Sequence, residues 1–244
     1  MKMSSNTMLI TGATSGIGLA FAERFLRGGN EVIICGRREA LLQEIKQKYP
    51  AIHIYTCDVT KEAERIKLFE WATQNFPTLN VLINNAGIQR RVELPPQEPW
   101  SDTVEEIEAN LNAPLHLSFL FAPHLEKQAN AALVMVSSGL AFVPMARTAV
   151  YCATKAAIHS FTLSARYALG KKGIEVIEII PPAVATDLGG PGIHARATPI
   201  DEFIDSAMSQ LEQQKPEVTY GFSEQTSHAS RQEIDATFAR MNGS

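Results

Sequence analysis

Short runs of β-branched and other apolar residues alternate along the chain with longer segments in which apolar residues recur at helical spacing. The segments that predict strands are Met8–Ile10, Glu31–Cys35, Ile52–Thr56, Val81–Asn84, Ala132–Ser137, Ile174–Ile180 and Glu217–Tyr220. The segments that predict helices are Ile17–Arg27, Glu62–Phe76 with Thr60 as its N-cap, Thr103–Leu125 and Val150–Gly170. Strands and helices that alternate in this way indicate βαβ units around a parallel sheet.

Two of the predicted strands differ in their polar pattern. The run Ala-Leu-Val-Met-Val at 132–136 is apolar on both faces, which is typical of a central parallel strand. The strand at 174–180 alternates around Glu175 and Glu178, so we expect it to lie nearer an edge of the sheet or to carry one polar face.

No internal repeat, low-complexity tract or linker divides the chain. We therefore expect residues 1–244 to form a single α/β domain of the doubly wound Rossmann type, with helices on both faces of a parallel sheet of about seven strands. Three prolines exclude regular structure over Leu94–Trp100. The glycine-rich stretch Leu188–His194 opens a region of about 188–215 that we interpret as a substrate loop, because ligands bind beyond the carboxyl ends of such strands.

Composition narrows the possible partners. The 244 residues carry 22 Lys and Arg against 26 Asp and Glu, without the dense basic face that nucleic acid requires. No apolar run approaches the ~18 residues of a membrane span, and the N-terminus lacks a signal-peptide core. Cys35, Cys57 and Cys152 lack the spacing of a disulfide framework or a metal site. We expect a cytoplasmic protein with no metal and no nucleic-acid or membrane partner.

Gly12, Gly16 and Gly18 fall between the first predicted strand and the first predicted helix. Glycines let the backbone approach a pyrophosphate, and a helix N-terminus offers free N–H groups to it. Although a tight turn alone could explain the glycines, their position between strand and helix favours a dinucleotide site.

The second strand ends in Gly36, Arg37 and Arg38, where an NAD site usually places an acidic residue. We expect both arginines to open a helix, where positive charge opposes the helix dipole. An adenosine 2′-phosphate would supply the missing partner through charge-assisted hydrogen bonds, which favours NADP; the alternative is a solvated charge pair.

Tyr151 and Lys155 share one face of a predicted helix because they are four residues apart, and Ser138 ends the central strand. A nearby ammonium favours the phenolate and would move the pKa of the tyrosine from about 10 toward 7. A tyrosine tuned in this way can give or take a proton at a carbonyl or alcohol oxygen. On its own the pair could also be an ordinary surface Tyr–Lys pair.

Taken together, Thr11–Gly18, Asn84–Gly87, Asn110, Ser138 and Tyr151–Lys155 resemble, in order and spacing, the short-chain dehydrogenase/reductase family over about residues 6–222. Local phrases such as Val-Ile-Ile-Cys-Gly-Arg and Gly-Phe-Ser-Glu are similar to the DltE-like branch of bacterial short-chain oxidoreductases. The resemblance implies strand order 3-2-1-4-5-6-7. It also implies an NADP(H)-dependent oxidoreductase that interconverts a carbonyl and a secondary alcohol by hydride transfer.

The resemblance also implies a role for each matching residue. Tyr151 would be the general acid/base, Lys155 would lower its pKa and hold the nicotinamide ribose, Ser138 would bind the substrate oxygen, and Asn110 would anchor a water. The implied NADP-binding residues are Gly12, Thr14, Ser15, Gly16, Ile17, Gly18, Arg37, Arg38, Asp58, Val59, Asn85, Ala86, Gly87, Tyr151, Lys155, Pro181, Val184 and Thr186. Pro182 stands where the family usually has glycine. Taken alone, Asp58 suits a helix cap and Asn85 a turn.

Two other functions compete with this reading. A regulator could sense NADP(H) without turnover, although it would not need an acid/base. Serine-type hydrolysis at Ser138 lacks the Gly-x-Ser-x-Gly elbow. The small-molecule substrate is not identified by the sequence, and family resemblance implies a homodimer or homotetramer paired through the helices at 103–125 and 150–170.

Several further residues are candidates for the substrate pocket and its surroundings. The apolar candidates are Phe142, Pro144, Met145, Leu188 and Ile193, and the candidates at the rim are Arg90, Arg91 and His194. We expect His159 on a helix surface, with a position facing the site as the alternative. Pro114 lacks an N–H, so it predicts a helix kink that frees the Asn110 carbonyl for an ordered water on a route toward Lys155.

Overall fold

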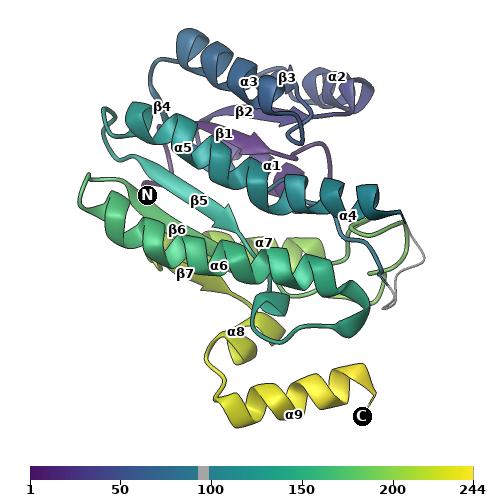
Figure 1. Ribbon diagram of the computed structural model, residues 1–244. Coiled ribbons are helices and arrows are strands. Elements are labelled where there is room, and N and C mark those ends of the chain that lie inside the picture. The colour runs from purple at the N-terminus through teal and green to yellow at the C-terminus, as the bar shows by residue number, and fades with distance from the viewer. Residues whose placement is uncertain (93–98, 244) are drawn as a thin grey trace.

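The computed structural model describes residues 1–92 and 99–243, with a seven-stranded parallel sheet at their centre (Figure 1). The strands lie in the order β3-β2-β1-β4-β5-β6-β7, which confirms the predicted doubly wound topology. Their bounds are β1 (Thr7–Thr11), β2 (Glu31–Gly36), β3 (His53–Thr56), β4 (Leu79–Asn84), β5 (Ala132–Val136), β6 (Glu175–Ile180) and β7 (Glu217–Thr219).

Helices connect the strands and extend the chain beyond the last one. They are α1 (Gly16–Arg27), α2 (Glu39–Lys48), α3 (Glu62–Asn75), α4 (Trp100–Ile107), α5 (Ala113–Leu125), α6 (Ala149–Gly170), α7 (Ile200–Glu212), α8 (Phe222–Ser227) and α9 (Arg231–Asn242). Three short elements complete the set: the π-helix η1 (Glu108–Asn112) and the 3-10 helices η2 (Gly139–Ala141) and η3 (Ala146–Thr148). No helix within residues 1–92 and 99–243 is long and apolar enough to cross a membrane.

Apolar side chains that alternate along the strands build one core on each face of the sheet. Met8 and Ile10 of β1 point to the face covered by α1, α2 and α7, where Phe21 and Phe203 are fully buried. Leu9 points to the opposite face, which α3, α5 and α6 cover. Because successive strand residues face opposite sides, a parallel strand with helices on both sides must be apolar throughout.

β6 lies one strand from the edge of the sheet, as its polar pattern predicts. Glu178 is nevertheless completely buried. Its Oε1 accepts a hydrogen bond from Ser137 Oγ at 2.5 Å, and its Oε2 lies 2.9 Å from His159 Nδ1. The surface position expected for His159 is therefore wrong, since this half-buried side chain covers a buried carboxylate.

The single helix predicted over Thr103–Leu125 is three elements, α4, η1 and α5. Pro114 lies in the first turn of α5, directly after the π-helix, and the N–H of Ala113 bonds to the carbonyl of Glu108, five residues earlier. A wider π-turn is one way in which a helix accommodates a residue that cannot continue the ordinary pattern. The helix is therefore irregular at Asn110, as expected, but through a π-turn.

Local signals misplaced one helix cap and one helix start, although the start of α3 at Glu62 is as predicted. α3 begins at Glu62 after Lys61, and the N–H and hydroxyl of Thr60 instead donate to Asp58 Oδ1 at 3.0 and 2.8 Å. The irregular segment predicted for Leu94–Trp100 lies mostly outside the described residues, but Trp100 already begins α4. Within the predicted substrate-loop region, residues 200–212 form α7, which packs on the core.

Candidate active site

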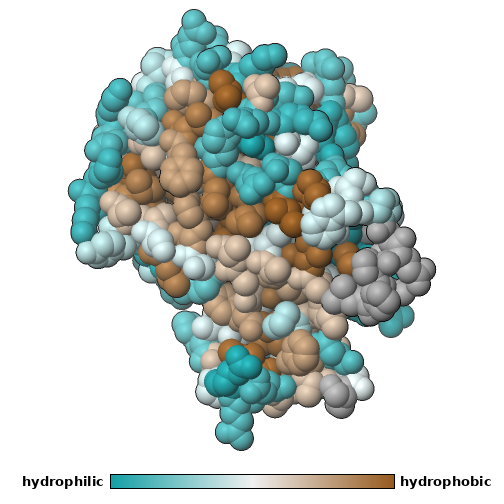
Figure 2. Space-filling view, in the orientation of Figure 1, coloured by the Kyte–Doolittle hydropathy of each residue, from teal (hydrophilic) through white to brown (hydrophobic). Residues whose placement is uncertain are grey.

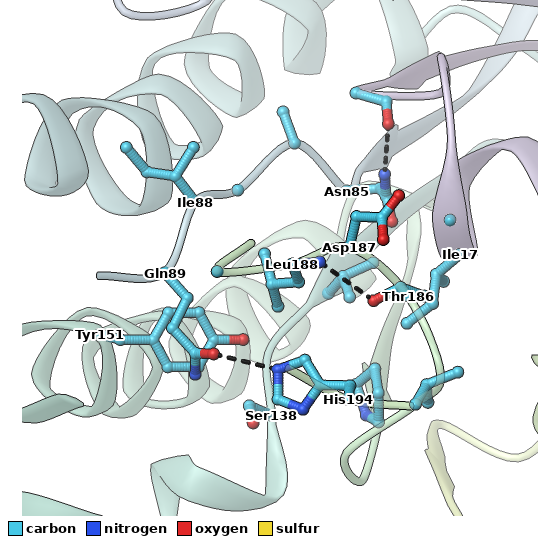
Figure 3. Close-up of a pocket in the computed structure, with 18 of the residues that line it drawn as sticks. Ile17, Asn85, Ile88, Gln89, Ser138, Tyr151, Thr186, Asp187, Leu188 and His194 are labelled. Atoms are coloured by element: carbon cyan, nitrogen blue, oxygen red, sulfur yellow. Dashed lines mark hydrogen bonds between the residues drawn. The ribbon is translucent and has the colours of Figure 1, made fainter. Parts of the chain in front are cut away.

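A cavity of about 1150 Å³ opens at the carboxyl ends of the strands. Every residue predicted from the sequence for catalysis or cofactor binding lines it, except Asn110. Figure 3 shows side chains from distant parts of the chain, including Ile17, Asn85, Ser138, Tyr151 and Thr186, gathered around this space. The structure therefore brings the motifs of the sequence to one place.

The glycine loop between β1 and α1 is packed closely against the segment after β4. A Cβ on Gly12, whose φ is +66°, would lie 2.6 Å from the Ala86 Cα, so only glycine fits there. Thr11 Oγ1 accepts hydrogen bonds from the N–H groups of Asn85 and Ala86, both at 3.0 Å. Asn85 Nδ2 in turn donates to the Thr11 carbonyl at 2.8 Å.

The N-terminus of α1 faces this loop without a side-chain cap. Ser15 occupies the N-cap position but makes no capping hydrogen bond, and the first turn contains no acidic residue. The first N–H groups of a helix have no partner within it, so an uncapped end beside a glycine loop can receive an anion.

Arg37 and Arg38 stand at the end of β2, directly before α2. Arg38 Nη2 donates to the hydroxyls of Thr14 and Ser15 at 2.6 and 2.8 Å. Arg37 Nη1 lies 2.8 Å from Glu105 Oε1, so the prediction that Arg37 lacks a partner is wrong. Glu105 also binds Arg90, and hydrogen bonds from the two arginines lower the pKa of its carboxyl against the opposing effect of burial.

Asp58 and Val59 follow β3 on the same wall of the cavity. Asp58 Oδ1 holds Thr60, and the carbonyl of Val59 accepts from Arg65 Nη1 at 2.6 Å. Asp58 therefore orders the turn before α3 without acting as its N-cap, because Lys61 occupies that position.

The side chains of Tyr151 and Lys155 meet beneath the end of β5. Both are buried near the start of α6, and Lys155 Nζ lies 5.6 Å from the centre of the Tyr151 ring. Lys155 Nζ donates to the Val136 carbonyl at 2.8 Å. Ser138 Oγ accepts from the N–H of Leu140 at 3.1 Å, so the hydroxyl hydrogen of Ser138 stays available for another acceptor.

Burial dominates the acid–base properties of this pair. It raises the pKa of Tyr151 far above the ordinary value, while a hydrogen bond with Ser138 opposes this by a smaller amount. Burial lowers the pKa of Lys155 to about 8, and the negative charge of Glu178 opposes this effect. The expected tyrosine pKa near 7 is therefore not found in the protein alone, where the buried phenol is neutral.

Asn110 lies behind the cavity wall, in the π-helix. Its Oδ1 accepts from the N–H of Ile88 and its Nδ2 donates to the carbonyl of Ile88, both at 2.8 Å. Nδ2 also lies 3.3 Å from Thr154 Oγ1 on α6. Asn110 thus fixes the segment after β4 against the helix that carries Tyr151.

Pro181, Val184 and Thr186 follow β6 on the far wall. The Pro181 carbonyl accepts from the N–H of Gly139, and Val184 forms a parallel bridge with Thr198. Pro182 is therefore accommodated in an ordered turn between two fixed residues.

Sequence reasoning missed several lining residues. Phe222 of α8, Met241 of α9 and Arg147 of η3 all reach the cavity, whereas the candidates Phe142 and Pro144 are not among its lining residues. Phe142 instead packs on His159 with ring centres 4.6 Å apart. Asn242 Oδ1 accepts from the N–H of Ala146 at 2.7 Å, which ties α9 to this wall. No local sequence signal connects residue 241 with residue 147.

The described residues contain no group of three or more His, Cys, Asp or Glu side chains arranged to hold a metal ion. The three cysteines are buried, and none of them forms a disulfide.

Similar proteins share both the sequence and the fold. A family model described as short chain dehydrogenase matches residues 6–195. The protein named uncharacterized oxidoreductase DltE from Bacillus subtilis is 48% identical, covering 99% of this chain and 98% of its own.

Two similar solved structures are complexes with an NADP cofactor. A short chain dehydrogenase from Burkholderia cenocepacia in complex with NADP has a TM-score of 0.85 at 25% identity, covering 98% of this chain and 99% of its own. One from Sphingobium yanoikuyae in complex with NADPH has a TM-score of 0.79 at 26% identity, covering 96% and 93%. With its matched motifs and its full-length likeness to DltE, this chain belongs to the short-chain dehydrogenase family, in the DltE-like branch.

Proposed function

We propose that this protein is an NADP(H)-dependent oxidoreductase that interconverts a carbonyl and a secondary alcohol. The observation that carries the proposal is the convergence of Tyr151, Ser138 and Lys155 on one cavity that also contains the uncapped N-terminus of α1. The three side chains can transfer a proton to or from an oxygen atom, and the N-terminus of α1 can bind a pyrophosphate.

The residues present fit an NADP cofactor. The glycine loop leaves backbone space that a Cβ would fill at Gly12, and the end of α1 offers N–H groups for the pyrophosphate. Arg38, whose Nη2 donates to the hydroxyls of Thr14 and Ser15, would hold the adenosine 2′-phosphate. Arg37 would hold it as well, while it also contacts Glu105. When bound, the cofactor supplies the hydride that is added to the carbonyl carbon.

Tyr151 and Ser138 would act on the substrate oxygen. A neutral, buried phenol is the protonated form that a reduction needs, because its proton passes to the oxygen as the carbonyl carbon gains the hydride. The Ser138 hydroxyl, which already accepts from Leu140, can donate its own hydrogen to the same oxygen. Two donors at this point stabilise the negative charge that develops there.

Lys155 would stabilise the phenolate that remains after proton transfer. One of its three N–H donors is bonded to the Val136 carbonyl. The other two would be available to the ribose hydroxyls and to hydrogen bonds directed toward Tyr151. Asn110 acts further back by holding Ile88, the residue after the Asn85–Gly87 segment.

We also propose that the protein is a homodimer or homotetramer paired through α5 and α6. Figure 2 shows apolar surface across these helices, and their exposed large side chains include Phe119, Leu163 and Tyr167. Apolar patches of this kind on a helix pair mark contact surfaces.

Tyr151→Phe tests the chemistry. With NADPH and a panel of ketones, aldehydes and quinones, we expect kcat to fall about 10²–10⁴-fold for the substrates that the wild type reduces, because the acid is lost. NADPH binding and the circular dichroism spectrum should not change, and Tyr49→Phe, outside the cavity, should retain activity. A regulator would leave wild type and Tyr151→Phe equally inactive while both bind NADPH.

Arg37→Ala and Arg38→Ala test the cofactor. Each removes charge-assisted hydrogen bonds to the 2′-phosphate, so NADPH should bind about 10-fold or more weakly in calorimetric titrations. NADH, which lacks that phosphate, should lose little affinity. Arg27→Ala changes the charge equally on an exposed part of α1 outside the cavity and serves as the control. Equal binding of NADH and NADPH by the wild type would contradict the assignment.

Lys155→Met tests the stability cost of the buried ammonium. The pKa of Lys155 is about 8 in the folded protein and 10.5 in its ordinary state. This difference corresponds to a cost of about 3 kcal/mol for keeping the ammonium charged in its buried position. Between pH 8 and pH 10.5 this residue binds more protons in the unfolded chain than in the folded one, so wild-type stability should rise across this interval. Urea unfolding of Lys155→Met should lack this rise, whereas the exposed Lys127→Met should retain it. A rise of equal slope in Lys155→Met would contradict the burial argument.

Phe119→Glu tests the oligomer. A carboxylate in the proposed apolar contact should shift the sedimentation coefficient toward that of a monomer, because the charge would be buried without a partner. Phe238→Glu on α9, a matched exposed phenylalanine, should sediment as the wild type does. A wild type that is monomeric at micromolar concentration would exclude this interface.

A further inference from the structure

Three arginines from distant parts of the chain line the cavity, and we call the part around Arg91, Arg147 and His194 its substrate end. Arg91 follows the segment after β4, Arg147 lies in η3 just before α6, and Arg196 lies between β6 and α7. The N–H of Val92 donates to the carbonyl of Arg147 at 3.0 Å, so the first two segments run side by side.

None of these three arginines has a carboxylate partner among residues 1–92 and 99–243. Arg147 Nε donates only to the Met145 thioether at 3.1 Å. Arg37 and Arg90 line the same cavity, yet Glu105 binds both of them. Of the described residues that line the cavity, the carboxylates are Asp58 and Asp187, and neither forms an ion pair with an arginine.

The positive charges of Arg91 and Arg147 both act on the side chain of His194. Its side chain reaches over the cavity to Gln89, near Tyr151 and Ser138 (Figure 3), with 3.3 Å between Nε2 and Gln89 Oε1. Burial lowers its pKa, and the charges of Arg91 and Arg147 lower it further. The two arginines stand here beside an imidazole that stays neutral. Their positive charges are therefore close to one another, an arrangement that a bound anion would stabilise.

Apolar side chains share this end with the arginines. Met145, Ile193 and Met241 line it, together with the ordered residues of the loop after β6. Apolar side chains therefore accompany the arginines in the cavity that also contains the phenol of Tyr151. The arginines at the end of β2 lie on the wall assigned to the cofactor, so this second positive group is free for the substrate.

We propose that Arg91 and Arg147, with Arg196 lining the same cavity, bind an anionic group of an otherwise apolar carbonyl substrate. Resting on the proposed function, this inference specifies its substrate as a carbonyl compound with a carboxylate or phosphate at the end remote from the reacting carbon. Both anions present oxygen pairs that match the fork of a guanidinium group.

Binding of non-reacting ligands tests this inference without turnover. Hexanoate, hexyl phosphate and hexanamide are each titrated into the protein by calorimetry. Saturating NADP⁺ is present throughout, so that the sites at which the protein binds the cofactor phosphates are already filled. We expect at least one anion to bind about 10-fold or more tightly than the neutral amide, since charged hydrogen bonds exceed neutral ones. The stronger of the two anions identifies the group.

Arg91→Gln and Arg147→Gln should each bring the anion-to-amide ratio of affinities close to one. Arg91→Lys, which keeps the charge but loses the fork, should retain part of the preference, and Arg27→Gln should retain all of it. Because the exposed Arg91 and Arg147 form no ion pair with the residues that the structure describes, their glutamine variants should fold, which thermal unfolding checks. Equal binding of amide and anions by the wild type, or a ratio unchanged in both glutamine variants, would overturn the inference.

Together with an assay of NADPH-dependent reduction of anionic and neutral carbonyl compounds, this titration separates the inference from the proposed function. If anions bind preferentially but no anionic or neutral carbonyl compound is reduced with NADPH, the reductase assignment fails and the anion site stands. If neutral ketones are reduced and anions show no preference, the reductase assignment stands and the anion site fails.

Discussion

Burial of the Lys155 ammonium is the constraint on which this site depends. A buried charge is unfavourable unless hydrogen bonds and an opposite charge accompany it. The end of β5 supplies the Val136 carbonyl, and β6 supplies the carboxylate of Glu178, which Ser137 and His159 in turn satisfy. The positions of the ends of β5 and β6 relative to α6 therefore depend on the Lys155 charge as well as on apolar packing.

The π-helix at Asn110 extends this constraint to the other side of the cavity. Asn110 must reach both backbone groups of Ile88 while its neighbours stay packed against α6. Pro114 cannot supply the N–H that an ordinary helix would use, and the wider turn accommodates it. One irregular turn thus sets the position of the Asn85–Gly87 segment relative to Tyr151, and with it the width of the cavity between them.

The sequence predicted the sheet and its order because strand signals and family motifs are local. It also predicted the lining residues that belong to motifs, such as Gly12 and Tyr151. It did not predict the environment of Glu178, since period-two alternation indicates a polar position and cannot tell a solvated carboxylate from a buried one. Met241 and the Arg37–Glu105 pair depend on long-range packing, which no local pattern encodes.

The distribution of charge around the cavity links these observations. Arg37 and Arg38 at the end of β2 contact a carboxylate and two hydroxyls, and the buried ammonium of Lys155 contacts the Val136 carbonyl. The outer arginines, by which we mean the exposed Arg91, Arg147 and Arg196, have no carboxylate partner among residues 1–92 and 99–243. A charge that stays exposed keeps its hydration until a ligand arrives, so the outer arginines avoid the cost that Lys155 carries. If they bind the substrate as proposed, they would attract its anionic group over several ångströms and orient it before contact, while the reaction would take place at the buried phenol of Tyr151. The attraction of a substrate would then be separated in space from the chemistry performed on it.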